Sequence, residues 1–280
     1  MQAQQDMPKA RRVATTMRQN RLQVEQPRRN SGPDSAVPSA AAPVIVAKRE
    51  RSVRHAIRGV AFALSRRFRA RRAERFRAQF KLDAGARILD LGGGDGEHIR
   101  MVLEGSAARL ADVYVADVNE KALERARAYG HPTALLTQDG KVPFPDGFFD
   151  VVFCSSVIEH VTVPKSEVWQ HRSELFAQKA IAHQRAFADE ILRISKSFWV
   201  QTPARSFFLE THSWLPFLGW LPRAAQLAVL RCTRHFWLSR HPPDYYLLTR
   251  GHMEALFPGA RIVSERWLGM TKSWIAVRQH

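Results

Sequence analysis

The chain has 280 residues, of which 45% are hydrophobic and 25% are charged. These values are ordinary for a folded globular protein, and they exclude collagen-like, wholly disordered and disulfide-scaffold classes. Two cysteines, Cys154 and Cys232, are too few for a disulfide framework, so we expect a reducing compartment. We expect no secretory signal peptide, and no apolar stretch reaches the roughly 18 residues of a membrane-spanning helix.

The positive charge is concentrated at the start of the chain. Residues 1–80 carry 19 of the 43 Lys and Arg residues but only 5 of the 26 Asp and Glu residues, and the whole chain has a net charge of +17. Residues 81–280 are therefore nearly neutral. Nucleic-acid-binding proteins usually carry basic patches on the folded domain itself, so we do not expect a nucleic-acid partner.

The first 80 residues form two segments. Residues 1–47 are rich in Gln, Arg, Ala, Ser and Pro, which predicts a disordered basic tail. In residues 48–80 apolar side chains recur every three or four positions, which predicts a basic amphipathic helical segment. We expect this helix to pack on the following domain with its charged face in solvent. The alternative is peripheral contact with an anionic membrane, which would place a cytoplasmic protein at the inner membrane face.

Residues 81–280 alternate between strand and helix patterns and form one predicted domain. Strands are predicted over 86–91, 113–115, 134–137, 149–155, 198–201, 261–267 and 273–278. Helices are predicted over 97–105, 119–129, 166–194 and 249–257. This order predicts an α/β fold with an open, mostly parallel sheet and helices on both faces. The irregular, aromatic-rich residues 204–247 are predicted to form an insertion or cap after the fifth strand.

A glycine-rich turn follows the first predicted strand. Gly92, Gly94 and Gly96 allow a ligand to approach the backbone closely, at the end of the sheet where open α/β folds bind ligands. The spacing fits neither the dinucleotide fingerprint G-x-G-x-x-G nor a P-loop. Asp90 stands just before the glycines, and a carboxylate there suits a cationic or amino-acid ligand better than a pyrophosphate.

Two more acidic residues follow predicted strands. Asp117 comes 25 residues after Gly92, where a carboxylate can accept both hydroxyls of a ribose. Asp139 follows the third strand and could receive an adenine amino group. Asp117 could instead be a helix N-cap, and Asp139 a turn former. Three acids at successive strand ends favour a binding site.

These motifs resemble the class I S-adenosylmethionine-dependent methyltransferases, in particular the methyltransferase-type-11 group. The resemblance rests on Ile88-Leu-Asp-Leu-Gly-Gly-Gly-Asp-Gly96, Val115-Ala-Asp-Val-Asn119, Pro143-Phe-Pro-Asp-Gly-Phe-Phe-Asp-Val-Val152 and Cys154-Ser-Ser-Val-Ile-Glu-His-Val161. It covers about residues 80–203 and 247–278. It implies a Rossmann-like fold with a seven-stranded-type sheet and an enzyme that transfers a methyl group from S-adenosylmethionine.

The resemblance also assigns roles in cofactor binding. The methionine half of the cofactor would be held by Asp90, Gly92, Gly94 and Gly96. Asp117 would bind the ribose, and Asp139, with the backbone of Gly140, would bind the adenine. Ser155 and Ser156, at the end of the fourth strand, would line the cofactor next to its methyl group.

His212, with Glu210, is the candidate general base for a hydroxyl acceptor, because both follow the carboxyl end of the fifth strand. The alternative for His212 is a structural, hydrogen-bonded role. We interpret the Glu159-His160 pair as packing and cofactor-shaping residues, and His98 as a possible contact of the cofactor carboxylate. No His, Cys and carboxylate residues recur at a metal-ligand spacing, so the sequence predicts no metal.

The predicted reaction is O-methylation of a small molecule, a glycan or a lipid-linked intermediate. An RNA methyltransferase is one alternative, because a basic tail can bind RNA without specificity. A non-catalytic protein that binds the cofactor or tethers to a membrane is the other. The sequence gives no further information on the acceptor.

Overall fold

A computed structural model describes residues 42–137, 140–170, 174–233 and 242–280. Residues 1–41 of the predicted tail, and Asp139, lie outside the described residues. The chain divides into the units Met1–Ala47 and Lys48–His280, and the second unit contains the sheet and its cores. Helix α1 (Ala42–Gln79) is continuous, so the helix begins six residues before the predicted start at residue 48.

Seven strands form one sheet with the order β3-β2-β1-β4-β5-β7-β6. The strands are β1 (Ile88–Leu91), β2 (Val113–Asp117), β3 (Thr133–Leu135), β4 (Phe149–Ser155), β5 (Ser195–Pro203), β6 (Arg261–Trp267) and β7 (Met270–Arg278). The first five run parallel, and β7 pairs antiparallel with both β5 and β6. The strand order reverses between β1 and β4, so their carboxyl ends form the crevice in which such sheets bind ligands. The predicted open, mostly parallel sheet is confirmed.

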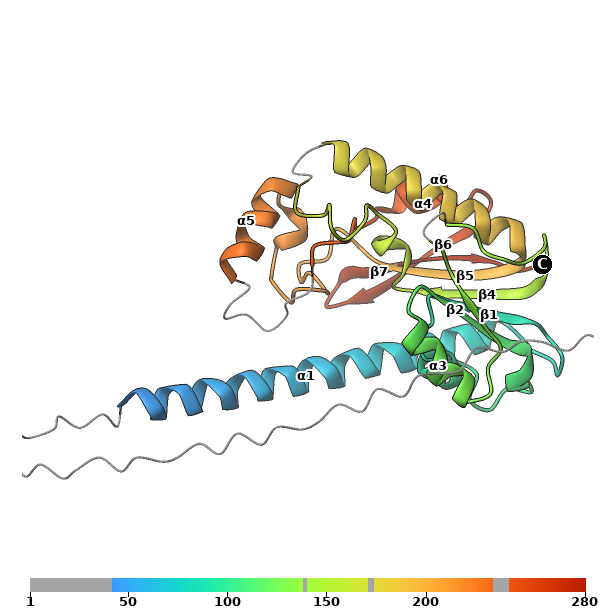
Figure 1. Cartoon of the computed structure of the whole chain (residues 1–280), viewed down its shortest axis with the longest axis horizontal. Coiled ribbons are helices and arrows are strands. Elements are labelled where there is room, and N and C mark those ends of the chain that lie inside the picture. The colour runs from blue at the N-terminus through green and yellow to red at the C-terminus, as the bar shows by residue number, and fades with distance from the viewer. Residues whose placement is uncertain (1–41, 138–139, 171–173, 234–241) are drawn as a thin grey trace, which may run out of the picture. The chain divides into compact units, whose positions relative to one another are not determined.

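Helices cover both faces of this sheet (Figure 1). They are the end of α1, α2 (Glu97–Val102), α3 (Glu120–Ala128), α4 (Glu174–Ile194) and α6 (Arg250–Leu256), whereas α5 (Arg223–Thr233) belongs to the insertion. One core joins the sheet to α4 and α6, and the other joins it to α2, α3 and the end of α1. The central strands β1, β4 and β5 are therefore buried on both sides, which explains their nearly continuous apolar sequence.

The C-terminal part of α1 belongs to the domain core. Phe68, Ala73 and Phe76 are buried, and the Phe76 ring meets Phe153 and Trp199 edge-on at 5.3 and 5.8 Å. Earlier in the helix Val60 is 69% exposed, so the predicted apolar stripe is not buried along its whole length. Arg72 is buried at 7% exposure, which corrects the expectation that the arginines lie on a solvated face.

The described part of the insertion is more ordered than its sequence pattern predicts. A short 3-10 turn, Leu218–Trp220, and helix α5 pack around a small separate core of Leu215, Leu218 and Leu230. Isolated bridges tie Ala204 to Leu248 and Leu209 to Pro216. Within the described residues, no helix combines the length and the apolar character needed to cross a bilayer.

Candidate functional site

The glycine turn after β1 has the left-handed backbone that its sequence predicts. Gly92, Gly94 and Gly96 have φ values of 77°, 60° and 75°. A side chain at Gly92 would collide with Val157 at 2.5 Å, whereas a Cβ at Gly94 would meet nothing within 4 Å. Gly92 thus allows close packing of the loop on the chain after β4, and Gly94 leaves open space beside the loop.

Asp90 lies beneath this turn and is almost completely buried. Its Oδ2 atom has no hydrogen-bond partner among the described residues. Burial, together with the charges of Asp117 and Asp95, raises the pKa of Asp90 to about 8. A buried carboxyl group with a free oxygen is suited to receive a cationic ligand, because the ligand's charge offsets the cost of ionisation.

Asp117, at the end of β2, connects the glycine turn to the start of α3. Its Oδ2 accepts a hydrogen bond from the backbone N–H of Gly94, and its Oδ1 accepts one from Asn119, both at 2.9 Å. Asn119, not Asp117, is the N-cap of α3. Each carboxylate oxygen has a second lone pair, so Asp117 can still accept ribose hydroxyls.

Two arginines of α1 add positive charge near the glycine turn. Burial and the charges of Arg69 and Arg72 lower the pKa of His98 to about 3, so its ring is neutral. The Nε2 atom of His98 is buried without a hydrogen-bond partner among the described residues. A carboxylate ligand fits this place. Sequence analysis missed both arginines, although Arg72 lies midway between the buried Phe68 and Phe76 on one helix face.

Ser155 and Ser156, at the end of β4, are held by one residue of β5. Their hydroxyls donate to Oε1 of Gln201 at 2.8 and 3.1 Å, and Nη1 of Arg72 donates to the same atom at 2.8 Å. Ser156 has a φ of 60°, which is uncommon for a residue with a side chain and is a form of strain often found at functional sites. Gln201 was not predicted from sequence.

The adenine end of the predicted site is described only in part. Gly140 is exposed and has a φ of 75°. Asp139 lies outside the described residues, so its predicted contact with adenine stays a prediction.

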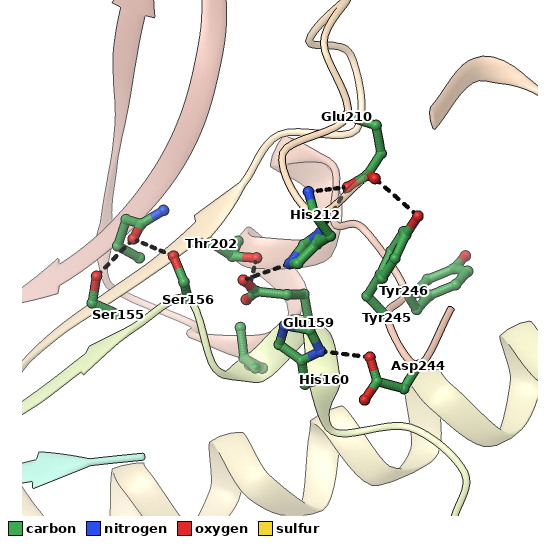
Figure 2. Close-up of polar contacts among 12 residues, drawn as sticks. Ser155, Ser156, Glu159, His160, Thr202, Glu210, His212, Asp244, Tyr245 and Tyr246 are labelled. Carbon is green, nitrogen blue, oxygen red and sulfur yellow. Dashed lines mark hydrogen bonds and ion pairs between the residues drawn. The ribbon is translucent and has the colours of Figure 1, made fainter. Parts of the chain in front are cut away.

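A second cluster of polar residues is centred on His212, in the loop after β5 (Figure 2). Oε1 of Glu210 lies 2.7 Å from Nδ1 of His212, and its Oε2 accepts from the Tyr245 hydroxyl at 3.0 Å. Burial alone would lower the pKa of His212, but the carboxylates of Glu159 and Glu210 raise it to about 10. Burial likewise opposes ionisation of Glu210, yet the contact with His212 holds its pKa at about 2.

The Glu159-His160 pair joins this cluster from the chain after β4. Glu159 is fully buried, and its Oε2 accepts from the Thr202 hydroxyl at 3.0 Å. Nδ1 of His160 lies 3.0 Å from Oδ1 of Asp244, and the rings of His160 and His212 are 4.7 Å apart at right angles. Both pairs follow the carboxyl ends of predicted strands, which placed them on the ligand side of the sheet, but the sequence gave no signal that they come into contact or that Asp244 joins them.

The residues of the first cluster fit S-adenosylmethionine. The free oxygen of Asp90 suits the positively charged amino group, and the charged arginines suit the carboxylate. Asp117 suits the ribose, and the open space at Gly94 admits the ligand. Together, the fold and this site are those expected of a class I S-adenosylmethionine-dependent methyltransferase domain, and the residues present fit S-adenosylmethionine as the cofactor.

Comparison with known proteins agrees with this class. Residues 89–175 match a family model described as a methyltransferase domain. The chain is 35% identical over 91 residues to a ubiquinone biosynthesis O-methyltransferase of Azoarcus sp. (strain BH72), covering 30% of this chain and 37% of that protein. It is 33% identical over 90 residues to a ubiquinone/menaquinone biosynthesis C-methyltransferase of Paraburkholderia xenovorans (strain LB400), covering 30% and 37%. The chain thus spans little more than a third of these relatives.

A solved structure extends the likeness over most of the fold. One chain of the complex between the Haloferax volcanii Trm112 methyltransferase activator and a methyltransferase superposes with a TM-score of 0.50. The match covers 79% of this chain and 95% of that chain at 15% identity. At this identity the likeness concerns the fold alone.

Proposed function

We propose that the chain is an active enzyme that transfers the methyl group of S-adenosylmethionine to an oxygen atom of an amphipathic acceptor with an anionic group. A small molecule, a glycan or a lipid-linked intermediate can meet this description. The observation that carries this proposal is the set of residues that line the cavity beside Ser156.

The cavity lies beyond the carboxyl ends of β4 and β5. It has a volume of about 200 Å³ and is bordered by Ser156, one residue past the end of β4, and by Pro203, the last residue of β5. Because the resemblance places the cofactor methyl next to Ser156, an acceptor in this cavity would be in position for in-line attack. Holding the two reactants in this way supplies much of the rate enhancement that a methyl transfer needs.

The cavity combines aromatic walls with positive charge. Phe68, Phe207 and Trp267 line it, and so do Arg72 and Lys272. The Lys272 ammonium lies 4.3 Å from the Phe68 ring centre. This combination favours an acceptor that has an apolar ring or chain beside an anionic group.

The positive charges exceed the acidic charge that faces them. Glu265 lies 3.3 Å from Nε of Arg72 and 3.5 Å from Nζ of Lys272, so one carboxylate pairs with two cations. Arg69 lines the same cavity as a further cation. Burial and the charge of Arg72 lower the pKa of Lys272 to about 8, so at neutral pH Lys272 is still mostly charged. The carboxylate of the bound cofactor would face the two arginines and balance one charge, and an anionic group on the acceptor would balance the charge that remains.

The His212 and Glu210 pair supports an oxygen acceptor, because His212 also lines the cavity. In the proposed step, an oxygen lone pair forms the new C–O bond while the C–S bond breaks and its electrons pass to sulfur. Nε2 of neutral His212 takes the hydroxyl proton, and S-adenosylhomocysteine is the second product. Because the pKa of His212 is about 10, the neutral form is the minor one at neutral pH, and the rate of transfer should rise as the pH approaches 10. The names of the relatives include both O- and C-methyltransferases, so the choice of oxygen rests on this cluster.

The proposal is tested by reversing one charge in the cavity. We expect Lys272→Glu to reduce methyl transfer to acceptors in an extract of the source cells at least tenfold, with the affinity for S-adenosylmethionine unchanged. Arg261→Glu is the matched control, because Arg261 is exposed on β6 and does not line the cavity. Equal transfer by both variants would contradict an anionic acceptor.

A further inference from the structure

Three potential metal ligands converge where β4 and β5 end. Glu159, His160 and His212 each offer one ligand atom, and these atoms all lie within 4.8 Å of one another. Glu159 and His160 belong to the 3-10 turn Ile158–His160 after β4, and His212 belongs to the loop after β5. The set contains two imidazole nitrogens and one carboxylate oxygen.

Both imidazole rings are oriented by a carboxylate on their outer side. Nδ1 of His160 lies 3.0 Å from Asp244, and Nδ1 of His212 lies 2.7 Å from Glu210. An Nδ1–H donated to a carboxylate directs Nε2 of each ring toward the centre of the cluster, where Nε2 of His212 faces Glu159. A metal ion would replace the proton that Nε2 of His212 carries in the metal-free chain. Histidines that bind metals almost always make this second contact, because it fixes the tautomer and the direction of the ring. Figure 2 shows Glu210 and Asp244 at the two ends of the cluster, with Glu159 and both rings between them.

Glu159 has an unsatisfied atom that a cation would complete. The residue is fully buried, and its Oε1 has no hydrogen-bond partner among the described residues. Nε2 of His212 lies 3.8 Å from this oxygen, an ion-pair distance that is too long for a hydrogen bond. A buried carboxylate oxygen without such a partner is costly, and a bound cation removes that cost.

We propose that Glu159, His160 and His212 bind a divalent transition-metal ion of the zinc class, with Asp244 and Glu210 orienting the two imidazole rings. Imidazole ligands favour zinc and its first-row neighbours over magnesium and calcium, which prefer oxygen. Three protein ligands leave one position of a tetrahedral ion open, as in catalytic zinc sites. The side chain of His160 is 36% exposed, which gives the ion a path from solvent.

A bound metal would change the role of His212 in methyl transfer. This consequence rests on the proposed function. A hydroxyl of the acceptor could occupy the open position, because His212 also borders the acceptor cavity. A bound divalent ion lowers the pKa of an oxygen ligand, so the acceptor would lose its proton more readily. His212 would then act as a metal ligand instead of a base, while the cofactor and the acceptor stay the same.

The first test measures metal binding by the full chain, prepared without a polyhistidine tag and stripped with a chelator. We expect isothermal titration with Zn²⁺ to show one site per chain, and Co²⁺ to give the visible absorption of a tetrahedral ion. His160→Ala and His212→Ala should abolish this site. His252→Ala is the matched control, because His252 lies on α6 outside the cluster, and it should bind normally. Zn²⁺ binding that is absent from the unaltered chain, or the same in all variants, would overturn the proposal.

The second test concerns the orienting carboxylates. Asp244→Asn should weaken Zn²⁺ binding about 10–100-fold, as loss of such outer contacts usually does. Binding of S-adenosylmethionine to each variant shows that the domain is folded, because the cofactor residues lie outside the cluster. It also separates the two proposals. Cofactor binding and metal binding without any methyl transfer would contradict the proposed function and leave the metal site standing. Methyl transfer by a chain that binds no metal would contradict the metal site and leave the proposed function standing.

Discussion

Glu210 lies 2.7 Å from Nδ1 of His212, and both residues belong to the loop that follows β5. Glu210 also accepts hydrogen bonds from the backbone N–H groups of His212 and Ser213, so its position in the loop is fixed. The ring of His212 is therefore held in one orientation at the edge of the acceptor cavity. Such positioning is what a group that acts on the acceptor requires, whether it takes a proton or binds an ion.

Replacement of His212 tests this role. We expect His212→Ala to lower turnover by about 10²–10⁴-fold, the usual contribution of general acid–base catalysis, and to spare the affinity for S-adenosylmethionine. Turnover is measured with labelled cofactor, and affinity by calorimetry. His252→Ala serves as the control histidine variant. Unaltered turnover of His212→Ala would remove the residue from the mechanism.

Asp117→Ala tests the ribose contact. Removing the carboxylate would lose two hydrogen bonds to the ribose, each worth about 1.5–3 kcal/mol when one partner is charged. The dissociation constant of S-adenosylmethionine should therefore rise at least about 100-fold. Asp95→Ala is the control, because Asp95 is a nearby acid of the same turn whose ion pair with Arg125 is largely exposed. An unchanged affinity of the Asp117 variant would rule out the ribose assignment.

The pKa of Asp90 predicts how stability depends on pH. In the ligand-free fold the pKa is about 8, compared with an ordinary value of 3.8 for an aspartate side chain. Between these values the unfolded chain releases the proton and the folded chain retains it, so stability from this group is present below pH 3.8 and is lost as the pH rises toward 8. Asparagine does not titrate, so the Asp90→Asn variant should not lose this stability as the pH rises.

The melting temperature of Asp90→Asn relative to the unaltered chain should therefore increase from about pH 5 to about pH 8. Differential scanning calorimetry without cofactor measures this difference. Parallel curves for the two proteins over this range would show that Asp90 is ionised in the fold. Addition of S-adenosylmethionine should reduce the difference, since its positive charge favours the ionised carboxylate.

The ion pair of Arg72 with Glu265 predicts a loss of stability when one partner is removed. Both side chains are buried, and Arg72→Met leaves Glu265 with Lys272 alone. We expect the free energy of unfolding to fall by about 3 kcal/mol, the lower end of the range for a broken buried pair.

Two further variants check this cause. Arg72→Met combined with Glu265→Gln should recover much of the loss, because no buried carboxylate is then left short of a partner. Arg109→Met breaks an exposed pair with Asp112 and should cost less than about 1 kcal/mol. Denaturant unfolding measures all three. An equal cost for the buried and the exposed pair would contradict the assignment.

The sequence predicted the sheet well because local pattern and burial agree there. The strands Phe149–Ser155 and Arg261–Trp267 have the predicted bounds, and the glycine turn lies where its motif indicates. Strand β5 begins at Ser195 instead of 198, directly after α4 ends at Ile194. No turn residue separates the two elements, so the sequence offered no signal for that boundary.

The second cluster could not be predicted in the same way. Glu159, His212 and Asp244 come from three separate segments, and only the packing of the insertion against β4 and β5 brings them together. Arg72 was missed for a different reason. In an arginine-rich helix, residue type alone predicts that each arginine lies on the solvent-exposed face. Its spacing from Phe68 and Phe76 was the available signal.

Methyl transfer to an amphipathic, anionic acceptor can be tested directly in an extract of the source cells. The full chain is incubated with this extract and methyl-labelled S-adenosylmethionine, and the products are separated into lipid, polysaccharide, small-molecule, protein and nucleic-acid fractions. We predict label in the lipid, polysaccharide or small-molecule fraction, on an anionic compound, above the level given by Asp117→Ala. Label in the nucleic-acid fraction, or none in any fraction while the cofactor binds, would contradict the proposed function.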